Sequence, residues 1–86
     1  MKELERVLKA LANYRRLAIL RCLKREPEAS VGKIAGEIRL SFKATSKHLR
    51  ILSNADLLEK DQRSLVVYYR LANRQRQFVS TLLNQL

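Results

Sequence analysis

The sequence predicts a mainly α-helical domain with one small β-hairpin, in the order helix, helix, helix, helix, hairpin, helix. Apolar residues recur at intervals of three and four over most of the 86-residue chain, as they do on one face of a helix. The strong backbone breakers are only Gly32, Gly36 and Pro27. By contrast, residues 65–71 gather β-branched and aromatic side chains, which favour strands.

The first two helices are separated by one polar interruption. The apolar residues of the first fall at i, i+3, i+4 and i+7, and they are Leu4, Val7, Leu8 and Leu11. Asn13 interrupts this pattern, and residues 14–25 resume it. Proline disfavours helical conformation in the residue before it, so the second helix is predicted to end at Glu26-Pro27.

Each of the next two helices is opened by a serine, a residue type that caps helix N-termini. After Ser30, helical spacing lasts barely two turns, as far as Ile38. A brief connection leads to Ser41, and the fourth helix runs from there to about Asn54. Its apolar stripe is predicted to face the core, which would bury Phe42, Thr45, Leu49 and Leu52.

The C-terminal third combines the hairpin with a last helix. The two strands of the hairpin are predicted at residues 57–61 and 65–71, joined by a turn at Gln62-Arg63-Ser64. From Asn73 onward a broad apolar stripe predicts a helix that runs to the C-terminus.

The chain has room for a single domain, residues 1–86, and a domain this short buries only about 60% of the surface of its unfolded chain. Dimerisation would add buried area. Apolar residues of the two terminal helices exceed the needs of one small core, so we expect a homodimer; the alternative is a last helix that only covers its own domain. The predicted interface residues are Leu4, Leu8, Leu11, Phe78, Val79, Leu82, Leu83 and Leu86.

The charge balance favours a polyanionic partner. Eighteen Lys and Arg against eight Asp and Glu give a net charge of +10, which attracts nucleic acid first and an anionic membrane surface second. No apolar run approaches the roughly 18 residues that cross a bilayer, and the N-terminus lacks the apolar centre of a signal peptide. We therefore expect a cytoplasmic protein with no membrane partner.

The reactive residue types are too few for an active site. Cys22 is the only cysteine, which excludes an intrachain disulfide and a multi-cysteine zinc site within one chain. Its apolar neighbours favour a buried small hydrophobe over a redox sensor. One histidine, one cysteine and no paired carboxylates provide no acid, base or nucleophile set, so we expect neither enzyme activity nor a cofactor.

Two short helices followed directly by a hairpin are the elements of a winged helix-turn-helix domain. In that fold the second helix lies in the major groove of DNA, and the helix before it braces it. Between Ile38 and Ala55 the chain carries four basic residues and no acidic one. The predicted DNA contacts are Lys43, Ser46, Lys47 and Arg50 on this helix, with Lys60 and Arg63 near the wing.

Two other interpretations of the basic face remain open at this point. The first is that the charges form an ordinary solvated helix surface. The second is that the domain is a protein-interaction module that docks an acidic partner, because the fold does not fix the function. Binding to random duplex at low salt would favour the DNA-binding interpretation.

Three stretches together resemble the ArsR-type family of bacterial and archaeal regulators. They are residues 11–20, residues 40–52 with Ser-Lys-His-Leu at 46–49, and residues 68–71 with their paired tyrosines. Members of that family are dimeric winged helix repressors whose terminal helices form the subunit interface. The resemblance implies a DNA-binding transcriptional regulator, a repressor, whose helix 42–54 reads DNA with Ser41, Phe42, Lys43, Ser46 and Lys47.

Departures from the family pattern affect sensing. Many relatives bind a metal through cysteines on the third helix or through carboxylates and histidines on the last. Residues 29–33 contain no cysteine, and residues 73–86 contain no Asp, Glu, His or Cys, so we expect no metal site. The sequence does not identify an effector.

Two further residues are compared with the family pattern. Asp56 replaces the family's glycine after the reading helix and is expected to have a left-handed backbone conformation. His48 is expected to lie beside the wing as a hydrogen-bonded structural residue or phosphate neighbour.

Overall fold

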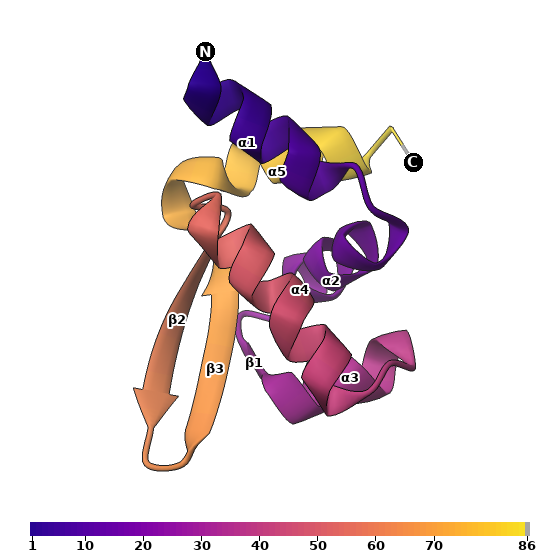
Figure 1. Cartoon of the computed structure of the whole chain (residues 1–86), viewed down its shortest axis with the longest axis vertical. Coiled ribbons are helices and arrows are strands. Elements are labelled where there is room, and N and C mark those ends of the chain that lie inside the picture. Colours follow the sequence, from indigo (N-terminus) through magenta and orange to yellow (C-terminus); the bar gives the residue numbers. More distant parts are fainter. Residues whose placement is uncertain (86) are drawn as a thin grey trace.

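The computed structural model describes residues 1–85 and confirms the predicted order of the main elements (Figure 1). The elements are α1 (Lys2–Leu11), α2 (Tyr14–Arg25), β1 (Ala29–Ser30), α3 (Val31–Ile38), α4 (Phe42–Asn54), β2 (Leu58–Arg63), β3 (Val66–Leu71), a 3-10 turn η1 (Asn73–Gln75) and α5 (Arg76–Leu83). The hairpin of β2 and β3 projects from one end of the molecule, whereas α1 and α5 lie at the other end. This is a winged helix-turn-helix arrangement.

Local hydrogen bonds define where the helices begin. The side chains of Ser30 and Ser41 accept bonds of 3.1 Å from the backbone N–H groups three residues on, which confirms both predicted caps. Asn13 caps α2 in the same way, accepting from the N–H of Arg16 at 3.1 Å. The residue that interrupts the first helical pattern therefore also starts the second helix.

The sheet has three antiparallel strands in the order β1-β3-β2. The sequence did not predict β1, whose two residues pair with Tyr68 and Tyr69 of β3. The hairpin turn is also shifted from its predicted place: Arg63 pairs with Val66, which leaves Ser64 and Leu65 as the two-residue loop. Ser64 has a φ of 58°, in keeping with the left-handed backbone that such tight loops use.

One residue of the predicted apolar stripe of α4 lies outside the core. Phe42 is 62% exposed, so its predicted burial was wrong. The other stripe residues of α4 are buried, as predicted: Thr45, Leu49 and Leu52. Helical Cα–Cβ bonds tilt toward the N-terminus. The side chain of the first helical residue therefore extends past the end of α4 instead of lying over the core.

Two further predictions concern chain geometry near helix ends. Asp56 has a φ of 61°, which confirms the left-handed conformation expected after α4. The last helix ends at Leu83 and does not continue through the following residues, because Asn84 and Gln85 form a turn. Leu86 lies outside the described residues. Between residues 1 and 85 no helix is long and apolar enough to span a bilayer.

Candidate nucleic-acid interface

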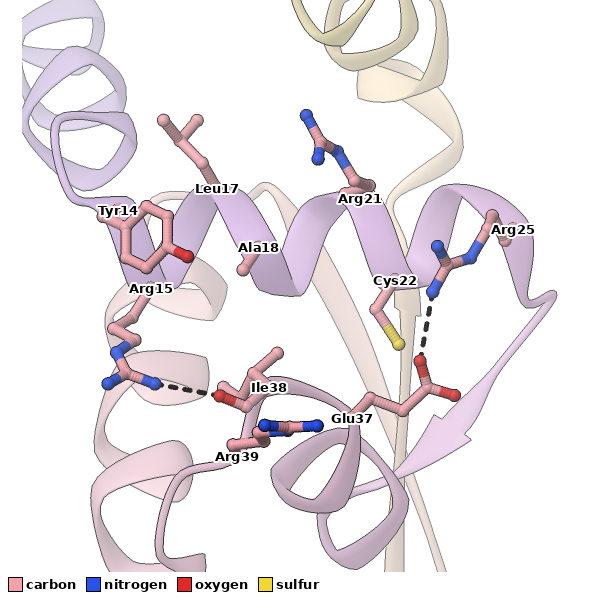
Figure 2. Close-up of a pocket in the computed structure, with 10 residues that line it drawn as sticks. All are labelled: Tyr14, Arg15, Leu17, Ala18, Arg21, Cys22, Arg25, Glu37, Ile38 and Arg39. Carbon is pink, nitrogen blue, oxygen red and sulfur yellow. Dashed lines mark hydrogen bonds and ion pairs between the residues drawn. The ribbon is translucent and has the colours of Figure 1, made fainter. Parts of the chain in front are cut away.

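The position of α4 is fixed by burial on one face and by the turn that precedes it. Leu49 and Leu52 are fully buried in the core shared with α2 and α3. The guanidinium of Arg15, on α2, donates a 2.9 Å hydrogen bond to the carbonyl oxygen of Ile38, at the end of α3 (Figure 2). The next residue, Arg39, is left-handed with a φ of 57°. The α3–α4 turn is thereby tied to α2, and α4 leaves it in a set direction.

The outer face of α4 carries cations without partners. Lys43, Lys47 and Arg50 stand at i, i+4 and i+7, all are exposed, and none takes part in an ion pair within residues 1–85. Ser46 lies half-buried on the same side, and Ser41 is exposed at the helix start. The structure therefore brings four of the predicted DNA contacts together on one surface of α4, which we call the α4 face: Lys43, Ser46, Lys47 and Arg50. Ser41 lies at the end of the helix, where its side chain caps α4.

The two basic residues predicted at the wing differ in their surroundings. Lys60 is exposed and pairs with Tyr69 across the hairpin. Arg63 is held by acids: its guanidinium donates to Glu28 at 2.6 Å and to Asp61 at 3.0 Å, and it lies 4.4 Å from the centre of the Tyr68 ring. Arg63 would have to give up these partners to contact a phosphate.

An apolar hollow separates the α4 face from the wing, and we call it the α4–wing hollow. It encloses about 380 Å³ and lies between the starts of α3 and α4 and the hairpin tip. Its lining residues are Ser30, Val31, Gly32, Phe42, Ser46, Leu65, Val66, Val67 and Tyr69. Sequence reasoning missed Leu65, which is 93% exposed at the tip. The available signal was a large apolar residue in a turn, where polar residues are usual.

His48 is a structural residue, as expected, but it does not lie beside the wing. Its Nδ1 atom is 3.2 Å from Nη1 of Arg16 on α2, and the same arginine donates to the carbonyl of Ala10 at 2.6 Å and of Lys9 at 3.3 Å. His48 therefore contacts the α1–α2 junction. Partial burial, and then the positive charges of Arg16, Lys47 and Arg15, lower the pKa of His48.

A second hollow, of about 500 Å³, lies between α2 and the end of α3 (Figure 2). Its rim carries four arginines, of which Arg25 forms a 3.0 Å ion pair with Glu37 across the opening. Cys22 lies at its base and is 2% exposed, which confirms the predicted burial. Burial raises the pKa of the Cys22 thiol, so the unreactive protonated form is favoured. Within residues 1–85 no three His, Cys, Asp or Glu side chains are grouped to hold a metal ion.

The predicted interface residues of the terminal helices fall into two groups. Leu11, Val79 and Leu83 are buried in the chain's own core, so they offer little surface to a second copy. Leu4, Leu8 and Phe78 are exposed by 51%, 53% and 41%, and Leu82 is partly buried. Leu4 and Leu8 line an open apolar hollow of about 320 Å³ along α1.

Relatives with known sequences and structures share this architecture. Transcriptional activator HlyU from Vibrio cholerae serotype O1 is 36% identical over 80 residues, which is 93% of this chain and 73% of that protein. The solved homodimeric winged helix-turn-helix DNA-binding domain of Mb0332 from Mycobacterium bovis, a possible ArsR-family transcriptional regulator, has a TM-score of 0.88 and 32% identity, covering 94% of this chain and 75% of that one. The transcriptional repressor BigR from Xylella fastidiosa has a TM-score of 0.82 and 27% identity, with coverage of 99% and 87%.

A family model supports the same assignment. The model for the bacterial regulatory proteins of the arsR family matches residues 13–60, a span that includes α2, the helix-turn-helix and the first part of the wing. The match covers more than half of the chain, and the winged helix geometry extends through the remainder. The chain therefore belongs to the ArsR family of winged helix, DNA-binding transcriptional regulators.

Proposed function

We propose that this protein represses transcription by binding double-stranded DNA as a homodimer, with α4 of each subunit in the major groove. The observation that carries the proposal is the α4 face, where Lys43, Lys47 and Arg50 are exposed and free of ion-pair partners within residues 1–85. Such cations release counterions from DNA when they contact phosphates, which drives binding. A helix of this kind fits the major groove, where base edges differ most.

The wing and the second subunit complete the proposed site. Lys60 would contact the backbone beside the groove, and Arg63 would do so after exchange with Glu28 and Asp61. The exposed apolar side chains of Leu4, Leu8 and Phe78, with Leu82, would meet their counterparts in a two-fold dimer. The two α4 helices would then enter successive major grooves about 34 Å apart on a pseudo-palindromic site.

Repression is proposed because such a dimer occludes any promoter that contains its site, with no further domain required. The relatives include both a transcriptional activator and a transcriptional repressor, so the proposal of repression rests on occlusion and not on the relatives. Since its target is chromosomal DNA, we place the protein in the cytoplasm of a bacterial or archaeal cell.

The test begins with selection of bound duplexes from a random pool, followed by affinity measurements at several salt concentrations. Each phosphate contact contributes about −0.9 to the slope of log affinity against log salt, so several contacts give a steep line. Lys47→Glu is expected to abolish most binding. Lys24→Glu makes the same charge change on α2, where Lys24 bonds Asn84 of the terminal region, and is expected to bind nearly normally.

The same measurements distinguish DNA binding from the competing function, the docking of an acidic protein. A chain that binds no duplex at low salt would contradict the proposal and favour a module whose α4 face docks an acidic protein. Equal losses in the two charge-reversal variants would show that net charge alone, and not the α4 face, determines binding.

A further inference from the structure

Phe42 is a large aromatic side chain exposed where DNA-reading helices make their base contacts. It is the first residue of α4, it is 62% exposed, and it adjoins Lys43, which has no ion-pair partner in the described part of the chain. In helix-turn-helix proteins the N-terminal residues of the reading helix contact base edges. The ring contributes little to the core, so most of its surface is available to a partner.

The surroundings of Phe42 are apolar on one side and cationic on the other. Across the α4–wing hollow lie Leu65 and Val66, which are exposed by 93% and 42%. The charged residues nearest to Phe42 in the chain are Lys43 and Arg39, both exposed. A partner that is polyanionic at its edges and apolar at its centre would match both kinds of surroundings.

The major groove of DNA meets that description at one base. Thymine is the one base that presents a methyl group, on C5, at its major-groove edge, whereas the polar groups of the other bases there are hydrogen-bond donors and acceptors. A phenyl ring cannot pair with those polar groups, and burying them unpaired is unfavourable. Contact with a methyl group, by contrast, removes apolar surface of both partners from water.

We propose that Phe42 determines specificity by packing against the C5-methyl group of a thymine in each half-site. This inference rests on the proposed function and adds the base that α4 selects. A protein partner for the hollow is the competing occupant. The position of Phe42 next to Lys43, an exposed cation of the α4 face, favours DNA, because a polyanion is attracted to that face while it covers the ring.

The test replaces each thymine of the selected duplex in turn with deoxyuridine, which lacks only the methyl group. For the wild-type protein, one position in each half-site is expected to lose about fourfold in affinity, the equivalent of one buried methyl group. In Phe42→Ala this penalty disappears. Leu65→Ala truncates another exposed residue of the same hollow and keeps the penalty. Thermal unfolding checks that both variants fold.

Each outcome bears on one of the two claims. If no duplex is selected, the proposed function fails. If duplexes are selected but carry no fixed thymine in the half-site, or if deoxyuridine is neutral at every thymine, the role of Phe42 is refuted while DNA binding stands. A deoxyuridine penalty that persists unchanged in Phe42→Ala refutes it equally.

Discussion

The guanidinium of Arg16 joins three helices at His48, with its Nη1 atom 3.2 Å from the imidazole Nδ1. Arginine can only donate, so Nδ1 of His48 must be the unprotonated, accepting nitrogen, and the ring proton belongs on Nε2. The same guanidinium bonds the carbonyls of Lys9 and Ala10 at the end of α1. Protonation of His48 at Nδ1 therefore removes this hydrogen bond between α4 and the arginine that also holds the end of α1.

This geometry makes stability depend on pH. Burial and the neighbouring cations lower the pKa of His48 below its ordinary value of 6.5 in the folded chain. As the pH falls below that value, the unfolded state takes up a proton before the folded state does, so the free energy of unfolding decreases. Denaturant unfolding between about pH 7.5 and pH 5 should show this loss for the wild type and a smaller one for His48→Gln. Identical profiles would contradict the assignment.

Thr45 places a hydroxyl group in the core beneath α4. The residue is fully buried, and its Oγ1 atom has no hydrogen-bond partner among residues 1–85. Thr45→Val removes the hydroxyl at nearly constant shape and is expected to raise the free energy of unfolding by about 1 kcal/mol. Thr81→Val is the matched control, since Thr81 is exposed on α5 and its replacement should change stability little. A destabilised Thr45→Val variant would show that the hydroxyl is satisfied.

Leu8 tests the proposed dimer. It is 53% exposed on α1 and lines the apolar hollow there, so a glutamate at this position would put a charge into the subunit interface. Sedimentation should give a wild-type mass of twice the chain mass of 10.0 kDa and a Leu8→Glu mass close to 10.0 kDa. Leu65→Glu, at the exposed wing tip, should stay dimeric. A Leu8→Glu protein that keeps the dimer mass would place the interface elsewhere.

Glu28 restrains the wing arginine. Glu28→Gln weakens the 2.6 Å contact with Arg63, so the guanidinium has only Asp61 as an ion-pair partner to give up when it contacts a phosphate. Affinity for any duplex should rise, while the slope of log affinity against log salt should change little, because the number of phosphate contacts in the complex stays the same. Glu5→Gln breaks the ion pair with Lys9 on α1 and is the control for net charge. If both variants gain affinity equally, Arg63 does not contact the DNA backbone.

Features that depend on near neighbours in the chain could be predicted from the sequence. The caps at Ser30 and Ser41 act on N–H groups three residues away, and the proline at position 27 acts on the residue before it. The basic outer face of α4 could be predicted because the segment contains four basic residues and no acidic one. Local sequence alone determines such features.

Features that depend on distant partners could not be predicted. The two residues of β1 form a strand by pairing with the edge of β3. Arg63 forms an ion pair with Glu28, which is 35 positions away in the chain. Helical periodicity identifies the face on which Phe42 lies, but it does not tell how far a first-turn side chain extends past the helix end. It also cannot divide apolar residues of α5 between the core and a second subunit, as the burial of Val79 beside the exposure of Phe78 shows.

Protection from dimethyl sulfate shows directly whether α4 occupies the major groove, because this reagent methylates guanine N7 in the major groove and adenine N3 in the minor groove. With the selected duplex, guanine N7 atoms should be protected in two patches about one helical turn apart, roughly 10 base pairs. Lys47→Glu should remove both patches. Protection confined to adenine N3 would show that the protein binds the minor groove and would contradict the placement of α4.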